Sequence, residues 1–183
     1  VGHIIQGSGA TAYDAVEANG LLYVAAGSGG LEIYDISDPA QPELLGAYPT
    51  PAQGNEAREV QVVGNIAYVA DTWGGMMTFD VSNPANPVRV GGYPSSYASY
   101  GVAVSGNHAY VADYSAGLQV IDASDPANPQ RVGGCDTSEY ARGVAVSGNY
   151  AYVADEIAGL QVIDVSDPTN CVRVGGYDSI GTR

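Results

Sequence analysis

The chain repeats one pattern four times, and this repetition constrains its fold more than any other feature. The segment GLQVIDASDPANPQRVGG at residues 117–134 recurs as GLQVIDVSDPTNCVRVGG at residues 159–176. The tyrosine of a YVA motif occurs in each of four copies, at intervals of 45, 42 and 42 residues, as Tyr23, Tyr68, Tyr110 and Tyr152. A fixed period of this length indicates one repeated supersecondary unit that buries its apolar surface against neighbouring units.

Each copy predicts four short strands. The stretch VAVSGNYAYVAD at 144–155 has two apolar runs around Gly148-Asn149, which is typical of the two-residue turn of a β-hairpin. The next run, GLQVIDVSDP at 159–168, is rich in β-branched residues and stops at a turn-forming Asp-Pro, and a last run, VRVGGY, follows at 172–177. Four strands in about 42 residues, apolar on both faces, predict an all-β fold, a β-propeller built from four-stranded antiparallel blades.

The third strand and the turn after it carry a family resemblance. The segments GLEIYDISDP, GMMTFDVSNP, GLQVIDASDP and GLQVIDVSDP resemble LVIVD repeats, a β-propeller family found in large bacterial and archaeal surface proteins. The resemblance covers almost the whole chain and implies a propeller in an extracellular setting, but it implies no reaction. Two positions depart from the pattern, since Ala26 replaces an aspartate of the other copies and Cys171 replaces a proline.

The repeat makes residues 1–183 a single propeller domain or part of one. We expect blades at 9–55, 56–98, 99–141 and 142–183, and an extra N-terminal strand at 1–8 from a preceding blade, because Val1-Gly2 aligns with Val132-Gly133. Four closed blades need sixteen strands, whereas this count gives seventeen. We therefore expect a portion of a larger propeller, or an assembly in which another copy or chain covers the exposed sheet edges.

Charge and composition exclude several classes of partner. The chain has 20 acidic and six basic residues and a net charge of −14, which would repel nucleic acid and anionic lipid surfaces. No apolar run reaches the roughly 20 residues of a spanning helix, so membrane insertion is not expected. Cys135 and Cys171 are too few for a disulfide framework, and we expect two free thiols. An acidic, lysine-free composition suits the extracellular space or the cell surface of a prokaryote.

The acidic turns raise the question of a metal. Carboxylate and amide oxygens of the kind that Ca²⁺ prefers recur after the third strand, in the pairs Asp35/Asp38, Asp80/Asn83, Asp122/Asp125 and Asp164/Asp167. Alternatively, the first carboxylate accepts backbone N–H bonds and the second begins a turn with proline. We favour the turn, because no calcium motif is present, and expect neither a metal nor another cofactor. His3 and His108 have no neighbours that suggest a zinc or catalytic site, so no enzyme is expected.

The first strand of a propeller blade lines the central channel, so its first residues form the channel mouth. Aligned on the YVA tyrosine, these residues are Tyr13, Arg58, Tyr100 and Arg142. Tyrosine and arginine in this arrangement could hold an anion or a carboxylate through charge-assisted hydrogen bonds. We favour the alternative that the arginines neutralise acidic neighbours, because acidic residues outnumber arginines. The expected neighbours are Asp14, Glu59 and Glu139.

Positions that differ between copies are better candidates for a binding site than repeated ones, which any blade needs in order to fold. They lie in the loop between the second and third strands and in the link from the fourth strand to the next blade, and both connections emerge on one face. This loop face collects Trp73, Tyr97, Tyr114, Tyr140 and Ile157, with Glu139 and Glu156 beside them. Such residues are typical of a recognition surface, and equally of loops packed on neighbouring blades.

The sequence favours a non-enzymatic extracellular propeller with a recognition or structural role, which contacts other proteins or its own copies at the cell surface. The alternative is a carbohydrate-binding propeller in which Trp73 and the tyrosines stack on sugar rings. An enzyme with a site at the channel mouth is disfavoured, because no histidine or cofactor motif is found there. Its candidate residues would be Arg58, Arg142, Asp14 and Glu59.

Overall fold

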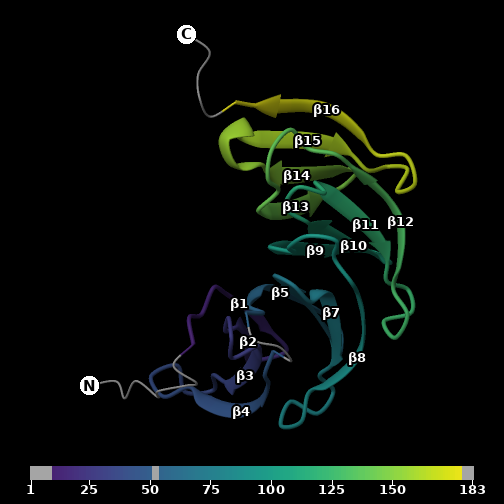
Figure 1. Ribbon diagram of the computed structural model, residues 1–183. Helices are drawn as coiled ribbons and strands as arrows, with labels where there is room; N and C mark the ends of the chain where they lie inside the picture. The colour runs from purple at the N-terminus through teal and green to yellow at the C-terminus, as the bar shows by residue number, and fades with distance from the viewer. Residues whose placement is uncertain (1–9, 51–53, 179–183) are drawn as a thin grey trace.

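The computed structural model describes residues 10–50 and 54–178 and confirms the all-β propeller fold. In these residues sixteen strands form four antiparallel four-stranded sheets, one blade after another along the chain (Figure 1). Within each blade the four strands are adjacent in chain order, from the inner strand to the outer strand. The additional strand expected at 1–8 lies outside the described residues.

The strand boundaries repeat from blade to blade. The first blade contains β1 (Asp14–Ala18), β2 (Leu21–Ala25), β3 (Leu31–Asp35) and β4 (Glu43–Tyr48); the second contains β5 (Ala57–Val63), β6 (Ile66–Asp71), β7 (Gly75–Asp80) and β8 (Val88–Tyr93). The third contains β9 (Gly101–Ser105), β10 (His108–Ala112), β11 (Leu118–Asp122) and β12 (Gln130–Cys135); the fourth contains β13 (Gly143–Ser147), β14 (Tyr150–Ala154), β15 (Leu160–Asp164) and β16 (Val172–Tyr177). A short 3-10 helix, η1 (Glu156–Ala158), connects β14 to β15.

Tight turns join the first two strands of each blade. Gly64, Gly106 and Gly148 have φ of 59°, 59° and 57°, a conformation that glycine adopts without steric cost. In the first blade the order is reversed, and Asn19 and Gly20 have φ of 56° and 79°. Because the turns have the same length, the hairpins share one register next to the turn, and only in the second blade does a bulge between Ala57 and Glu59 shift it at the start of β5.

The turns between the third and fourth strands are held by their own carboxylates, in agreement with the turn interpretation. Asp35 accepts a hydrogen bond from the Ser37 N–H at 2.7 Å, and the equivalent aspartates of the other blades accept one in the same way. Hydrogen bonds from the serine lower the pKa of each of these aspartates below its ordinary value. A second aspartate of the turn, for example Asp38, accepts the N–H of Ala40 at 3.0 Å.

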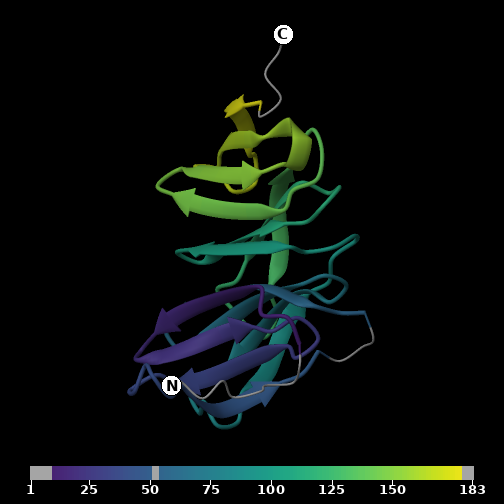
Figure 2. The ribbon, with the colours of Figure 1, turned by 90° about the vertical axis from the view of Figure 1, so that its left-hand side faces the viewer.

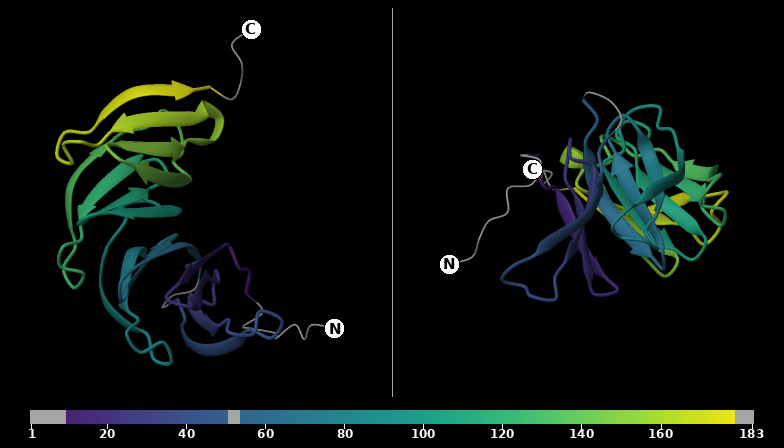
Figure 3. Two further views of the ribbon diagram at one scale, coloured as in Figure 1. Left: turned by 180° about the vertical axis from the view of Figure 1, so that it is seen from behind. Right: turned by 90° about the horizontal axis from the view of Figure 1, so that it is seen from below.

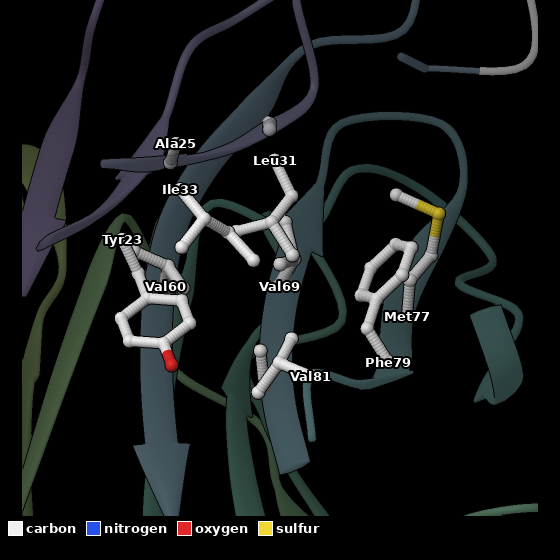
Figure 4. Packing of buried hydrophobic residues seen from close by; sticks show 11 residues of the cluster. Tyr23, Ala25, Leu31, Ile33, Val60, Val69, Met77, Phe79 and Val81 are labelled. Carbon is white, nitrogen blue, oxygen red and sulfur yellow. The ribbon is translucent and has the colours of Figure 1, made fainter. Parts of the chain in front are cut away.

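The core lies between the blades. Each blade has a leading face, turned toward the preceding blade, and a trailing face, turned toward the following one. On the first blade's trailing face, Tyr23, Leu31 and Ile33 are at most 2% exposed and pack against Val60 and Phe79 of the second blade's leading face (Figure 4). Equivalent clusters fill the next two junctions, and the last one includes both cysteines, which are free thiols as predicted. Each fully buried apolar side chain contributes about 1.5–3 kcal/mol, so blade stacking is the main source of stability.

A glycine on the outer strand allows the next blade to approach closely. An added Cβ at Gly133 would lie 2.0 Å from the carbonyl oxygen of Pro168, in the Asp-Pro turn of the following blade. The same contact occurs at the two earlier junctions, between Gly46 and Pro84 and between Gly91 and Pro126. This repeated backbone contact, here called the glycine–proline contact, explains the glycine that each VRVGGY-type strand carries at this position.

The four blades form an open arc, in which the first and last blades do not face each other (Figure 1 and Figure 3). Turned by a quarter, the blades lie one above another with the fourth at one end of the stack (Figure 2). Three interblade clusters are found within the described residues, one for each junction between consecutive blades. The trailing face of the fourth blade and the leading face of the first therefore lie at the two ends of the arc.

Candidate recognition site on the loop face

Aromatic side chains from two consecutive blades enclose a pocket on the loop face. Trp73 lies between β6 and β7, Tyr97 between β8 and β9, and Tyr114 between β10 and β11, so both kinds of variable connection meet there. Together with Ala98 and Tyr100 they line a pocket of ≈ 310 Å³. Trp73 and Tyr97 are 67% and 51% exposed, so their rings form an open wall of the pocket and not part of the core.

The channel-mouth residues form a continuous cation–π stack. The guanidinium carbon of Arg58 lies 4.0 Å from the ring centroid of Tyr13 and 5.4 Å from that of Tyr100. The guanidinium carbon of Arg142 lies 4.2 Å from the centroid of Tyr100 and 4.9 Å from that of Tyr114. Because Tyr100 and Tyr114 also line the pocket, the channel mouth and the loop aromatics form one array. Each cation–π contact stabilises the array by about 0.5–1 kcal/mol at such partly exposed positions.

The remaining candidate residues lie at the edge of this array. Tyr140 stacks on Tyr114, with ring centroids 4.2 Å apart and an interplanar angle of 5°. Ile157, in η1, is 56% exposed and does not line the pocket. Within residues 10–50 and 54–178, no group of three or more His, Cys, Asp or Glu side chains is placed to hold a metal ion.

Glutamates neutralise both arginines, but the expected partners were wrong. Arg58 forms an ion pair and a hydrogen bond with Glu56, and Arg142 does so with Glu156. The sequence had suggested Asp14, Glu59 and Glu139 instead. Glu56 lies two residues before its arginine, and side chains at this spacing in an extended segment point the same way. Glu156 reaches its arginine from the loop between β14 and β15, where its own φ is 40°, a local conformation that the repeat pattern does not reveal.

Asp14 and Glu59 connect the inner strands of neighbouring blades. The Asp14 carboxylate accepts a hydrogen bond from the Val60 N–H at 3.0 Å, and the Glu59 carboxylate accepts one from the Val102 N–H at 3.2 Å. The next blade has Gly101 at this position, where an added Cβ would lie 2.8 Å from a Glu59 carboxylate oxygen. Burial, together with the nearby charge of Asp14, raises the pKa of Glu59 to about 7.

The wild-type chain is expected to lose stability as the pH rises from 4.5 to 7, and Glu59→Gln is expected to abolish this loss. In this range Glu59 is protonated in the folded chain but ionised in the unfolded chain, whose glutamate pKa is near 4.5, so raising the pH favours unfolding. The variant should be about 1–2 kcal/mol more stable than the wild type at pH 8, since each pKa unit is worth about 1.4 kcal/mol before solvent screening reduces it. Urea unfolding at pH 4, 6 and 8 measures the difference.

The exposed Glu43→Gln is the matched control, and it should unfold like the wild type at every pH. A Glu59→Gln variant whose stability follows that of the wild type across the range would show that this carboxyl titrates normally.

Buried aspartates at the ends of the second strands hold the loops that carry the aromatic residues. Asp71 accepts hydrogen bonds from the N–H of Trp73 and from that of the next residue, at 3.2 and 2.7 Å. Asp113 accepts hydrogen bonds from two serine hydroxyls, one on each side of Tyr97 in the chain. Asp155 accepts a backbone N–H from the link before the fourth blade. This role was not predicted from the sequence, although the recurrence of the aspartate in three copies was a signal of it.

The array offers aromatic surface more than free charge. Each guanidinium is paired with a glutamate and lies over tyrosine rings, so an incoming anion would have to displace an existing partner. The pocket wall combines large rings with phenol and indole polar groups, which suits stacking and apolar contact with a few orienting hydrogen bonds.

Four-stranded blades stacked along an arc place this chain in the class of β-propeller proteins, with a preformed aromatic surface on the loop face. The family model described as LVIVD repeat matches it four times, at residues 18–50, 54–94, 98–137 and 138–179. The chain therefore belongs to the LVIVD repeat family. No curated protein matches it.

Solved structures share its fold at low sequence identity. The chain is similar to the computationally designed Ika4 protein, with 14% identity, a TM-score of 0.68, and coverage of 86% of this chain and 93% of that one. It is similar to the RRP9 WD40 repeats, with 12% identity, a TM-score of 0.74, and coverage of 94% and 55%. It is also similar to a functionally unknown protein from Desulfotomaculum acetoxidans, with 14% identity, a TM-score of 0.74, and coverage of 91% and 56%.

The chain thus spans about half the length of the last two proteins, and these likenesses show the propeller fold alone. Across the described part of the chain, the structure contains no helix of the length and apolar character needed to cross a membrane.

Proposed function

We propose that this chain is a non-enzymatic recognition propeller that binds a protein partner through the loop face, outside a prokaryotic cell. The observation that carries the proposal is the ≈ 310 Å³ pocket, whose aromatic wall stays exposed although buried aspartates fix the loops that bear it. Tryptophan and tyrosine provide large contact area at a small cost in side-chain entropy, and interface hot spots are enriched in them. Such a preformed surface supports binding without a large rearrangement.

Charge supports the same proposal and bears on the kind of partner. Both arginines of the array are already neutralised, which leaves recognition to ring contacts and not to a catalytic cation. The net charge of −14 favours partners with basic surfaces, because complementary charge accelerates encounter and disfavours acidic competitors. The acidic, lysine-free composition supports the extracellular setting.

Trp73→Ala is expected to weaken partner binding by about 2 kcal/mol, roughly 30-fold in Kd, without lowering the melting temperature. The indole is 67% exposed, so its removal costs little packing, while it forms one wall of the pocket. A partner is first recovered by affinity capture from cell envelopes with the immobilised chain, and surface plasmon resonance then compares the variants.

The matched control is Val63→Ala, which removes an exposed apolar side chain at the end of β5, beside the Gly64 turn and outside the loop face, and should leave affinity unchanged. Reduced thermal stability with unaltered affinity in Trp73→Ala would contradict the proposal and identify the indole as loop packing.

Carbohydrate binding is the second candidate. It is supported by the exposed rings of Trp73, between β6 and β7, and Tyr97, between β8 and β9. Aromatic rings exposed around a pocket stack on the apolar faces of sugars as readily as on protein side chains. A glycan array probed with the wild type and with Trp73→Ala separates the two candidates. Glycan signals that disappear in the variant would favour carbohydrate binding over a protein partner.

A further inference from the structure

The fourth blade carries the contact groups of the other blades without a blade to contact. On its trailing face Tyr152 and Leu160 are 37% and 40% exposed, whereas the equivalent Tyr110 and Leu118 of the third blade are 5% and 0% exposed. The outer strand β16 continues the apolar surface with Val174, which is 55% exposed. Within the described residues this sheet face is therefore uncovered, although it has the composition of a blade junction.

The glycine–proline contact is also incomplete at both ends of the arc. Gly175 occupies the position that meets a proline carbonyl at the three internal junctions, but an added Cβ there has nothing within 4 Å. At the other end, Pro39 occupies the matching proline position of the first blade and is exposed, while the three prolines in contact are only partly exposed. Gly175 at the end of the arc and Pro39 at its start therefore each lack the glycine–proline contact that their equivalents make.

A backbone bridge on the loop face joins consecutive blades at two of the three internal junctions in the described chain. Gly27 and Ala57 of consecutive blades exchange two N–H···O bonds of 3.1 and 3.0 Å, and Tyr114 and Ala141 exchange two of 3.2 and 3.0 Å. The first residue of each pair has positive φ, 51° and 45°. Glu156 has the same place in the fourth blade with φ of 40°, but no such bridge is found for it in the described chain. A left-handed conformation is costly for a residue with a side chain, and a bridge to a following blade would offset that cost.

The first blade presents the complementary surface. On its leading face Ala15 is exposed and Leu22 and Tyr34 are partly exposed, although their equivalents in the later blades are buried. Glu32, at the centre of this face, accepts a hydrogen bond from the Tyr34 hydroxyl at 2.6 Å. Covering the face would therefore not leave this carboxylate without a hydrogen-bonding partner.

We propose that the trailing face of the fourth blade binds the leading face of the first blade of a second copy, so that two copies close one ring head to tail. The apolar faces and the glycine–proline contact each have their missing half at the opposite end of the arc, and Glu156 lacks the backbone bridge that Gly27 and Tyr114 make to a following blade. A head-to-tail contact that closes makes a ring and leaves no blade face uncovered. One copy covers 55% and 56% of two solved propeller-fold chains, so chains of this fold can have about the length of two copies.

Gly175→Val tests the proposed contact between copies and should leave the fold of a single chain unchanged. Its added Cβ meets nothing within 4 Å in the single chain but would occupy the space of the Pro39 carbonyl of a second copy. We expect the wild-type chain at micromolar concentration to have twice the 18.7 kDa mass of one copy by multi-angle light scattering, and Gly175→Val to have the mass of one. A wild-type monomer at every concentration overturns the proposal, and so does a Gly175→Val dimer.

Leu22→Asp places a charge on the opposite face and tests the direction of the contact. This variant alone should also be monomeric, but an equal mixture with Gly175→Val keeps one intact junction and should regain the mass of two copies. Val88→Asp, on an exposed residue of β8 away from both ends of the arc, should stay dimeric. A Leu22→Asp dimer would indicate tail-to-tail pairing and overturn the proposal, and masses above two copies would overturn the closed ring. Circular dichroism verifies that each variant is folded.

Discussion

Leu118→Ala is expected to lower the free energy of unfolding by about 3 kcal/mol, whereas Leu160→Ala should lower it by less than about 1 kcal/mol. Both leucines occupy the same repeat position. Leu118 is 0% exposed in the cluster between the third and fourth blades, so its truncation removes apolar contacts and leaves a cavity. Leu160 is 40% exposed on the trailing face of the fourth blade, where water fills the space of the lost atoms.

Urea unfolding measures both losses, with each change made in a Gly175→Val background so that association adds no stability. Leu118→Met is the control for shape, and it should cost less than about 1.5 kcal/mol because it preserves volume. Equal losses at the two leucines would contradict the open arc, since they would mean that the fourth blade is covered in a single chain.

Gly133→Val is expected to destabilise the fold by about 3 kcal/mol or more and to lower the melting temperature by about 6–12 °C. An added Cβ would lie 2.0 Å from the Pro168 carbonyl oxygen, and a backbone oxygen has no rotamer by which to move away. The Asp-Pro turn of the fourth blade must therefore shift, which separates the apolar faces of the junction. At Gly175 an added Cβ meets nothing within 4 Å, so the same substitution should not change the melting temperature of the single chain.

Thermal unfolding followed by circular dichroism at low protein concentration compares the two valine variants. Gly133→Ala adds only the Cβ and is expected to fall between Gly133→Val and the wild type. A Gly133→Val chain that melts at the wild-type temperature would show that the outer strand does not need the close approach.

The local structure of this chain was predictable from its sequence because local signals determine it. Gly64-Asn65 and its counterparts form the tight turns that the hairpin pattern predicted, and Asp35 and its equivalents hold the Asp-Pro turns. Four copies of the same signals strengthen each one, and the period of about 42 residues identifies the blade. The gathering of Trp73, Tyr97 and Tyr114 around one pocket was also predictable, because these residues lie in the connections where the copies differ.

Partner choices within the site were less predictable. The sequence placed Arg58 and Arg142 at the channel mouth but assigned their charges to the wrong carboxylates. Two of these, Asp14 and Glu59, instead accept backbone N–H groups of the next blade. It also treated Tyr100 and Tyr114 as members of separate groups, although one guanidinium lies over both rings. These contacts depend on loop conformations and on how closely neighbouring blades approach each other. Neither can be predicted from the spacing of residues along the sequence.

By itself the sequence determined the blade, its turns, its four repeats and the variable face, because hydrogen-bonded turns and alternating apolar residues act over a few positions. Only the tertiary structure decided which of several equivalent residues pack against a neighbouring blade. Leu118 and Leu160, or Gly133 and Gly175, have nearly identical sequence surroundings, yet one of each pair is packed against a following blade and the other is open. The difference has a physical cause outside the repeat, since burial is a property of the neighbouring blade and a residue cannot encode whether that neighbour is present.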